Sequence, residues 1–145
     1  MKKPLIYKNN CRIEIIPLVY LDSFMFNRSE AIIKLKEGKE PFLMDAVSDT
    51  IKPSCNNRSQ DAGDIYQVGL SFRIAYLNSE TTNLLQVLKG YGSLLVSYFS
   101  SGGEHILLGT DLYPVFLTYN TLNNFDGYEV NLTGTQDIPP LIIAD

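Results

Sequence analysis

The stretch from Gly63 to Gly92 constrains the fold most, because a regular strand pattern passes directly into a regular helix pattern. Between residues 68 and 76 an apolar side chain occurs at every second position, which is typical of a strand with one buried face. The apolar residues in this pattern are Val68, Leu70, Phe72, Ile74 and Tyr76. The period then changes, and Ser79 provides a hydroxyl suited to capping a helix. We expect a strand at 68–76 and a helix from Ser79 to Gly90 or Gly92.

One face of the predicted helix is apolar. Leu84, Leu85 and Leu88 recur at helical spacing, and Tyr91 continues the same stripe. A helix of this kind buries its apolar stripe against a neighbouring element. We therefore expect these leucines to pack on the sheet face that carries Leu70 or its neighbours.

Size and composition indicate one domain over residues 1–145. The chain has 145 residues, of which 45% are hydrophobic and 19% are charged, so it is long enough to form its own core. Nine tyrosines and seven phenylalanines favour β-structure. No apolar run approaches the ~20 residues of a membrane span, and the N-terminal run is too short for a signal peptide. We expect synthesis in the cytoplasm and no membrane association.

The N-terminal half contains further strand patterns. Residues 11–20 alternate as far as Pro17, which predicts a strand with an edge or a bulge at the proline. Residues 21–30 show no clear period, and we expect a connection with one buried anchor. Residues 31–36 and 41–47 flank a charged turn that contains one glycine, which predicts a hairpin.

Residues 48–64 are poor in apolar side chains and rich in Asn, Asp, Ser, Gly and Pro. This composition predicts a loop of about 15 residues, longer than most connections in compact domains. The loop lies within a long loop or extended excursion that we place in residues 31–64. A tolerated surface excursion and a contact segment are both compatible with this composition.

The C-terminal half consists of short strand patterns separated by turns. The expected strands are residues 93–99, 104–109, 113–119 and 128–134. The first two form a hairpin around the Ser-Ser-Gly-Gly turn, and the apolar tail at 141–143 is expected to pack on its own domain or on a neighbour. Around eight strands and one helix predict an α+β fold, mainly antiparallel β, as a sandwich or partly closed barrel with the helix packed on the sheet.

The sequence contains no pattern typical of catalysis. His105 is the only histidine, and Ser97 and Asp111 lie near it in the sequence. No nucleophile-elbow glycines flank a serine, so we interpret His105 as a structural residue rather than a member of a catalytic triad. We expect no enzymatic activity and no catalytic residues.

Metal and cofactor patterns are not found either. Cys11 and Cys55 are isolated from each other and from the histidine, so they form neither a redox pair nor a zinc site. Cys11 is expected in the core, and a free Cys55 thiol favours a reducing compartment. The loop aspartates lack the spacing of a calcium loop, and Gly102-Gly103 lacks the lysine of a phosphate loop. We expect no metal and no cofactor.

Charge is unevenly distributed along the chain. Residues 73–145 contain two Lys/Arg against seven Asp/Glu. Phosphate binding needs clustered basic residues, so this balance argues against nucleic-acid binding by the C-terminal half. We expect no specific nucleic-acid partner.

Residues 61–141 resemble a group of small phage and prophage tail proteins. The segments that carry the resemblance are DAGDIYQVGLSFRI, LLQVLKG, LLVSYFSSGGEHILLGTDLYPVFLTY and GYEVNLTGTQDIPPLI. Leu108-Gly109, Tyr113-Pro114, Thr133-Gly134 and Pro139-Pro140 stand at the matching places, whereas the tryptophan often found ahead of the central strand is missing. The match consists of structural residues.

The resemblance implies a tail-tube-like fold and a non-enzymatic structural subunit of a phage or phage-derived tail. Such a subunit acts by forming rings with its own copies or by docking to neighbouring tail proteins. It would be present in the bacterial cytoplasm during assembly and then in the virion tail.

A ligand-binding β-sandwich of lectin or adhesin type is the alternative. That function needs aromatic side chains grouped on exposed loops. Tyr66, Tyr76, Tyr98 and Tyr128 mostly fall on strands in apolar register, which favours core positions for them.

Overall fold

The computed structural model describes residues 12–47, 49–61, 63–75, 78–122 and 127–143, so the predictions for Cys11 and Tyr76 lie outside it. Within these segments the chain is mostly antiparallel sheet with one α-helix packed on it, which confirms the predicted α+β class. The elements are β1 (Arg12–Pro17), the short helix η1 (Leu18–Tyr20), β2 (Leu21–Asn27), β3 (Glu30–Leu35), β4 (Phe42–Asp45), β5 (Lys52–Gln60), β6 (Gly63–Ile74), α2 (Ser79–Tyr91), β7 (Leu94–Phe99), β8 (His105–Leu108), β9 (Val115–Thr121), β10 (Tyr128–Gln136) and β11 (Leu141–Ile143).

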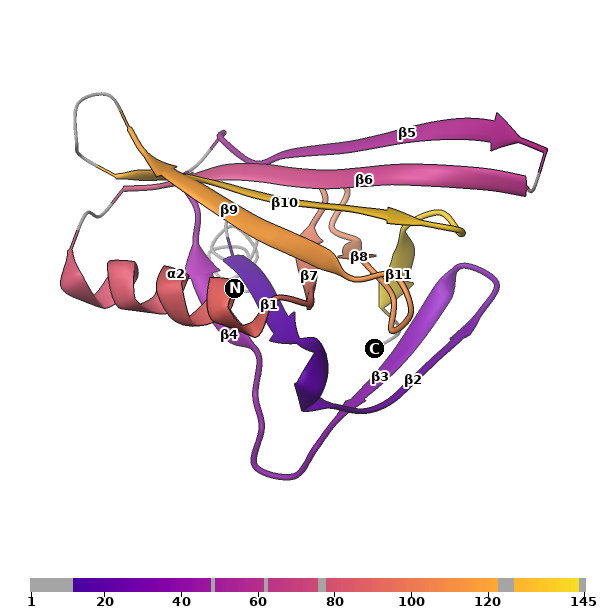
Figure 1. The fold of residues 1–145 in the computed structure, drawn as a ribbon, viewed down its shortest axis with the longest axis horizontal. Helices are drawn as coiled ribbons and strands as arrows, with labels where there is room; N and C mark the ends of the chain where they lie inside the picture. Colours follow the sequence, from indigo (N-terminus) through magenta and orange to yellow (C-terminus); the bar gives the residue numbers. More distant parts are fainter. Residues whose placement is uncertain (1–11, 48, 62, 76–77, 123–126, 144–145) are drawn as a thin grey trace.

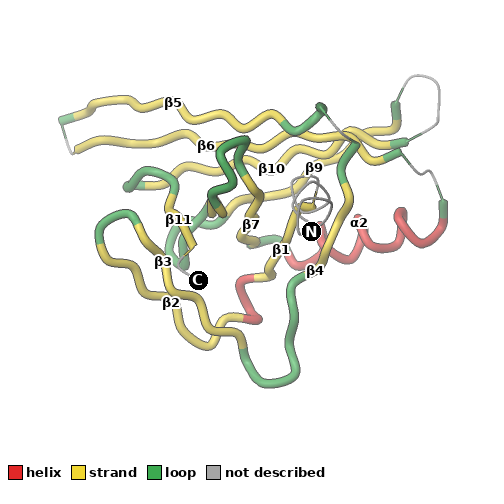
Figure 2. The backbone as a smooth tube through the Cα atoms, turned by 180° about the vertical axis from the view of Figure 1, so that it is seen from behind, coloured by secondary structure: helices red, strands yellow, loops and turns green. Residues whose placement is uncertain are grey.

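The strands belong to one open sheet that folds over itself. Its order is β2-β3-β11-β8-β7-β9-β10-β6-β5, and β1 pairs with β7 and β4 away from this path. Figure 1 shows β9, β10, β6 and β5 as a layer lying across β1, β7 and α2, and we call this layer the upper layer. From behind, the β2–β3 hairpin lies on the far side of β7 from that layer (Figure 2). The arrangement is sandwich-like, and β2 and β5 end the sheet instead of closing it into a barrel.

The sheet divides at β7. At Leu94 the partners of β7 are β1 and β9, whereas at Val96 they are β1 and β8. A strand has only two edges, so β8 and β9 share one edge of β7 and β1 occupies the other. This division lets β9 start the upper layer while β8 continues toward β11 and β3.

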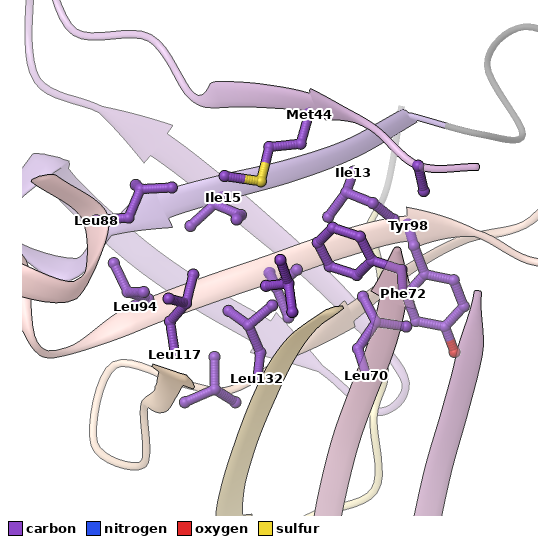
Figure 3. Close-up of a cluster of buried hydrophobic side chains, with 14 of the residues drawn as sticks. Ile13, Ile15, Met44, Leu70, Phe72, Leu88, Leu94, Tyr98, Leu117 and Leu132 are labelled. Atoms are coloured by element: carbon purple, nitrogen blue, oxygen red, sulfur yellow. The ribbon is translucent and has the colours of Figure 1, made fainter. Parts of the chain in front are cut away.

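Strand β7 is buried on both faces. Leu94, Val96 and Tyr98 point into the larger core, and Leu95 points into a smaller core on the other face. Figure 3 shows the larger core, where side chains from β1, β6, β7, β9, β10 and α2 meet. The smaller core is formed by Ile16, Ala31, Leu95, Leu107 and Leu141.

The helix occupies the predicted residues, but its cap differs from the prediction. Asn78 is the N-cap, and its side-chain oxygen accepts a hydrogen bond of 2.8 Å from the Thr81 N–H. Asn at this position satisfies a free N–H of the first turn as well as the expected Ser79 would. The helix ends at Tyr91, and its C-cap Gly92 has a positive φ of 78°, as a residue after a helix end often does.

The apolar stripe of the helix is buried as far as Leu88 and then leaves the core. Leu85 and Leu88 are fully buried, and Leu84 packs against the same core. Tyr91 is exposed and instead contacts the rings of Tyr20 and Phe42.

Residues 21–30 are not a connection. They form β2 and a two-residue turn in which Arg28 has a φ of 60°, and the chain returns as β3. The register of the pair shifts between Leu21 and Ser23, so β2 carries an irregularity that breaks the period of two. Phe24 and Leu21 are partly buried against the smaller core, and no residue of β2 is fully buried.

The predicted hairpin of residues 31–36 and 41–47 is wrong. β3 pairs with β2 and, in parallel, with β11, whereas β4 pairs with β1. The turn forms, with a φ of 78° at Gly38, but the two strands diverge after it. An alternating pattern specifies which face of a strand is buried and does not specify its neighbour, so either pairing satisfied the sequence.

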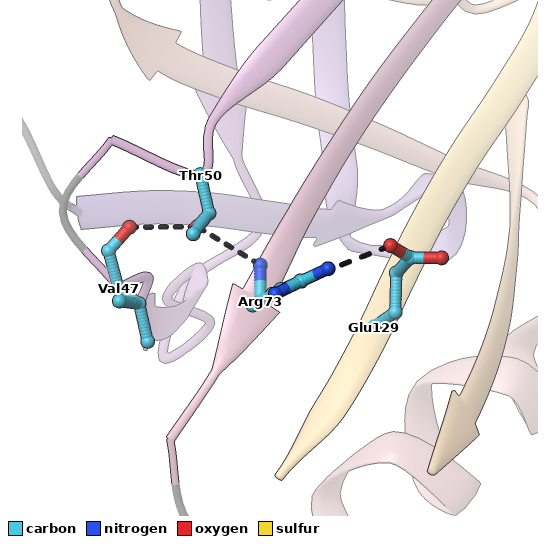
Figure 4. A network of polar contacts seen from close by, with 4 residues as sticks. All are labelled: Val47, Thr50, Arg73 and Glu129. Carbon is cyan, nitrogen blue, oxygen red and sulfur yellow. Dashed lines mark hydrogen bonds and ion pairs between the residues drawn. The ribbon is translucent and has the colours of Figure 1, made fainter. Parts of the chain in front are cut away.

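Residues 52–60 form a strand instead of the predicted loop. β5 pairs with β6 from Lys52–Ser71 to Gln60–Gly63 without a register shift. The connection before it is fixed to the end of β6, because Thr50 Oγ1 accepts from the Arg73 N–H (3.1 Å) and donates to the Val47 carbonyl (2.6 Å) (Figure 4). All of β5 is exposed, so no apolar alternation marked it in the sequence.

The remaining C-terminal predictions are confirmed in outline. β7 and β8 form the expected hairpin, and β9 and β10 are the strands predicted after it. Pro114 directly precedes β9, where its missing N–H is tolerated. The apolar tail packs on its own domain as β11, between β8 and β3, and Leu141 is buried in the smaller core.

We predict that Leu88→Ala lowers the free energy of unfolding by about 2–5 kcal/mol, because it removes a fully buried side chain and leaves a cavity. Val87, the residue directly before Leu88 in the helix, is 49% exposed, and Val87→Ala should change stability by no more than about 0.5 kcal/mol. Urea unfolding followed by circular dichroism measures both. Equal losses in the two variants would contradict the assigned helix face.

Candidate functional site

The histidine lies in a polar cluster at the margin of the smaller core. His105 Nε2 is 2.9 Å from Ser97 Oγ, and Ser97 Oγ donates to Glu14 Oε1 at 3.2 Å. The same Nε2 lies 3.7 Å from the Glu14 carboxylate, and the His105 ring stacks on Phe99 at 4.4 Å between centroids. Of the triad residues considered from the sequence, Ser97 and His105 meet, whereas Asp111 lies in the turn at 110–113 and the nearby carboxylate is Glu14.

This cluster is not arranged for nucleophilic catalysis. A triad needs the nucleophile on one ring nitrogen and the acid on the other, but here both Ser97 and Glu14 approach Nε2. Ser97 is also 0% exposed, so a substrate has no access to its hydroxyl. The cluster provides hydrogen-bond partners for the buried Ser97 hydroxyl on β7.

Acidic and cysteine side chains do not gather into a metal centre in the part of the chain that the structure describes. No group of three or more His, Cys, Asp or Glu residues lies in a metal-binding arrangement there. Cys55 is exposed and free on β5, and Gly102-Gly103 turns the β7–β8 hairpin.

A groove lies on the outer face of the upper layer. It has a volume of about 600 Å³ and crosses β5, β6, β10 and the chain leading into β9. We call it the outer groove, and its lining residues are Ser54, Asn56, Gln67, Val68, Gly69, Leu112, Tyr113, Pro114, Phe116, Thr133, Gly134 and Thr135.

Strand register builds the outer groove from aligned rows. Ser54, Gly69, Thr133 and Phe116 are consecutive partners across the layer. Asn56, Gln67 and Thr135 form the next row. Successive residues of a strand point to opposite faces, so the large apolar residues between these positions lie in the larger core. The outer face therefore carries hydroxyls, amides and one phenylalanine.

Two glycines give the groove its depth. A Cβ at Gly134 would lie 2.7 Å from the Pro114 carbonyl oxygen, so only glycine lets the 109–114 loop rest on β10. A Cβ at Gly69 would meet Ser54 Oγ at 2.9 Å and would otherwise fill the floor of the groove. Glycine at these two positions therefore contributes to the shape of the groove.

A buried glutamine, Gln136, fixes the start of the 109–114 loop, which forms one wall of the groove. Gln136 Oε1 accepts from the Gly109 N–H at 2.9 Å, and its Nε2 donates to the Ile138 carbonyl at 2.8 Å. Thr110 and Tyr113 then close a tight turn, because the Thr110 N–H donates to the Tyr113 carbonyl and the Tyr113 N–H donates to Thr110 Oγ1. Leu112 and Tyr113 are thus held on a fixed turn while their side chains are exposed.

Sequence reasoning missed the aromatic side chains of the groove. The alternation within residues 113–119 could have predicted an outward Phe116, because Val115, Leu117 and Tyr119 share the core face. Phe116 consequently lies on the outer face, and it is 50% exposed. Tyr98 and Tyr128 are buried and Tyr66 is partly buried against the larger core, as their register predicted.

The two strands that end the main strand order, β5 and β2, are the other notable surfaces, and β4 ends the branch through β1. β5 is the edge beyond β6, and it is long, regular and exposed along its whole length. Pro53 has no N–H, and in sheets proline occupies positions that face away from the neighbouring strand. We infer that the backbone groups of Pro53, Cys55, Asn57 and Ser59 point away from β6, because such groups alternate along an antiparallel pair.

At the other end of the sheet, β2 is an edge with exposed apolar side chains. Met25 and Ile32 are cross-strand partners on β2 and β3, and both are more than half exposed. Phe26, at the end of β2, is 47% exposed and contacts the Phe24 ring. Exposed apolar residues on a sheet edge are typical of a contact surface.

No protein-family model, curated protein or solved structure was found to match the chain. Among the residues that the structure describes, no helix has the length and apolar character of a membrane span.

We predict that Gln136→Ala lowers the free energy of unfolding by about 1–3 kcal/mol, because the Gly109 N–H and the Ile138 carbonyl lose their buried partner. Gln60→Ala, at the exposed end of β5, is the matched control and should have an effect of no more than about 0.5 kcal/mol. Chemical denaturation measures both. A Gln136→Ala loss as small as that of the control would show that water replaces the glutamine.

We also predict a loss of stability at alkaline pH that depends on Tyr98. Burial raises the pKa of the Tyr98 phenol above its ordinary value, and the nearby Cys55 adds to this effect. The neutral Tyr98 phenol contributes its full stabilisation at pH values below the unfolded-state pKa of about 10. This contribution is lost as the pH rises from there through the folded-state pKa. Urea unfolding from neutral to alkaline pH should show a steeper decline for the natural chain than for Tyr98→Phe. Parallel declines would contradict the prediction.

Proposed function

We propose that this chain is a non-enzymatic structural subunit that acts by self-association through its sheet edges. The observation that carries the proposal is β5, an edge strand whose nine residues are all exposed and whose register with β6 is unbroken. Edge strands of this length usually carry a bulge, many charges or a covering segment, because free N–H and C=O groups invite pairing with another strand. Here Lys52, Pro53 and Arg58 are the only such features on the strand itself.

The two ends of the main strand order differ, which favours head-to-tail assembly. β5 is polar, whereas β2 carries Met25 and Phe26 and stands at the opposite end of the strand order. Contact between the β5 edge of one copy and the β2 edge of the next uses two different surfaces and leaves one of each free. Such heterologous contacts generate rings when the rotation closes and filaments when it does not.

A tail is the proposed setting for this assembly. The support for it is the resemblance of residues 61–141 to small phage and prophage tail proteins, together with an edge geometry suited to rings. In this setting the partners are further copies and neighbouring tail components. The chain would be made in the bacterial cytoplasm and would end in the virion tail.

We predict that Asn57→Pro prevents self-association without unfolding the subunit. Its N–H is inferred to point away from β6, so proline there removes a group needed only by an incoming strand. Sedimentation velocity over a range of protein concentrations measures the association. Hydrogen exchange of β5 amides should also slow when the natural chain assembles.

Asn56→Pro is the matched control one residue away. Its N–H is inferred to bond to β6, so the same substitution should destabilise the β5–β6 pair without requiring any second copy. A monomeric natural chain at all concentrations, or association that survives Asn57→Pro, would overturn the proposed use of this edge.

A further inference from the structure

The outer groove points to a second property that does not depend on self-association. We propose that it binds a neutral oligosaccharide across β5, β6, β10 and the 109–114 loop. The volume of about 600 Å³ lies within the range of small-ligand sites, and the groove is open along the layer, as a chain-like ligand requires.

The aromatic side chains supply the apolar part of this recognition. Phe116 stands on the strand floor and Tyr113 on the loop, and both rings are substantially exposed without a covering segment among the described residues. An aromatic ring offers a flat apolar face of large area, which complements the flat C–H face of a pyranose. Leu112, the most exposed large apolar side chain of the described residues, extends the same wall.

The polar residues of the groove match sugar hydroxyls. Gln67 and Asn56 each offer amide donors and an acceptor, and Ser54, Thr133 and Thr135 offer hydroxyls that donate and accept. A sugar hydroxyl also donates and accepts, so it can pair with either kind of group. The regular rows repeat these groups across the strands, as an oligomer of similar units requires.

Charge selects a neutral ligand over an anionic one. None of the residues lining the groove is charged, although the chain as a whole has a net charge of −4. A phosphorylated or uronic-acid ligand would find no cation in the lining and would face a net negative protein. Nucleic acid is disfavoured for the same reason.

The groove is also formed without any ligand. Gln136 and the paired hydrogen bonds of the Thr110–Tyr113 turn fix the loop wall, and the paired strands fix the floor. Neither aromatic residue needs to be brought in from a distant segment. A preformed site lowers the entropic cost of binding, which matters for weak polar ligands such as sugars.

The test titrates isotope-labelled full chain with maltohexaose, cellohexaose, mannohexaose and chitohexaose, with hexagalacturonate as the anionic comparison. Backbone and aromatic NMR shifts report where each sugar binds. We expect saturable shifts at Gln67, Thr133 and Phe116 with at least one neutral hexasaccharide, at a Kd of about 1 mM or tighter. Hexagalacturonate should bind at least about tenfold more weakly.

Two variants separate binding from folding. Phe116→Ala should weaken the sugar by about tenfold or more, because aromatic anchors dominate small contact surfaces. Gly69→Thr fills the groove floor and should abolish binding. Threonine suits a strand, and the one close contact of the added Cβ is with Ser54 Oγ, at the end of a side chain that can rotate away. Phe26→Ala is the matched control, since Phe26 is exposed to a similar degree on β2, outside the groove.

The outcomes distinguish this proposal from self-association. Phe26→Ala should leave sugar affinity unchanged even where it weakens assembly, and Asn57→Pro should do the same. The proposal is overturned if no neutral hexasaccharide shifts the groove residues, if Gly69→Thr binds like the natural chain, or if hexagalacturonate binds best. Shifts at Thr133 and Phe116, away from the β5 edge, that arise from raising protein concentration alone, without sugar, would likewise overturn it in favour of a surface between copies.

Discussion

The burial of β7 on both faces is the constraint on which the rest of the structure depends. Because Leu94 and Val96 face one core and Leu95 faces the other, layers must cover the strand from both sides. The upper layer and α2 cover one face, and the β2–β3 hairpin with β11 covers the other. Ser97 is the polar exception on this strand, and His105 and Glu14 supply the hydrogen bonds that make its burial tolerable.

The same arrangement determines which surfaces remain for contact with other molecules. The inner face of the upper layer is used by the larger core, so alternation leaves its outer face to solvent along β6 and β10. The outer groove and the β5 edge are therefore neighbours, and Ser54 and Asn56 belong to both. One strand with almost no apolar surface thus carries an edge suited to pairing and a wall of the groove.

The strong patterns of the sequence predicted their elements well. The alternation through Leu70 and Phe72, the leucine stripe of the helix and the β7–β8 hairpin were recognised because burial imposes a clear period on each. The groove was not recognised, because its parts lie far apart in the sequence: Ser54, Gly69, Phe116 and Thr133 meet only through register across the layer. The outward position of Phe116 was the single sequence signal that pointed to it.

By itself, the sequence determined which segments bury a face, where the helix runs, and that the fold combines a mainly antiparallel sheet with that helix. Tertiary structure alone decided the partners of β3 and β4, the existence of β5 and the return of the apolar tail as β11. The physical reason is that periodicity records burial, which each residue experiences locally. Strand pairing instead depends on the backbone N–H and C=O groups, which nearly all residues share. An exposed strand such as β5 therefore shows no apolar period in the sequence.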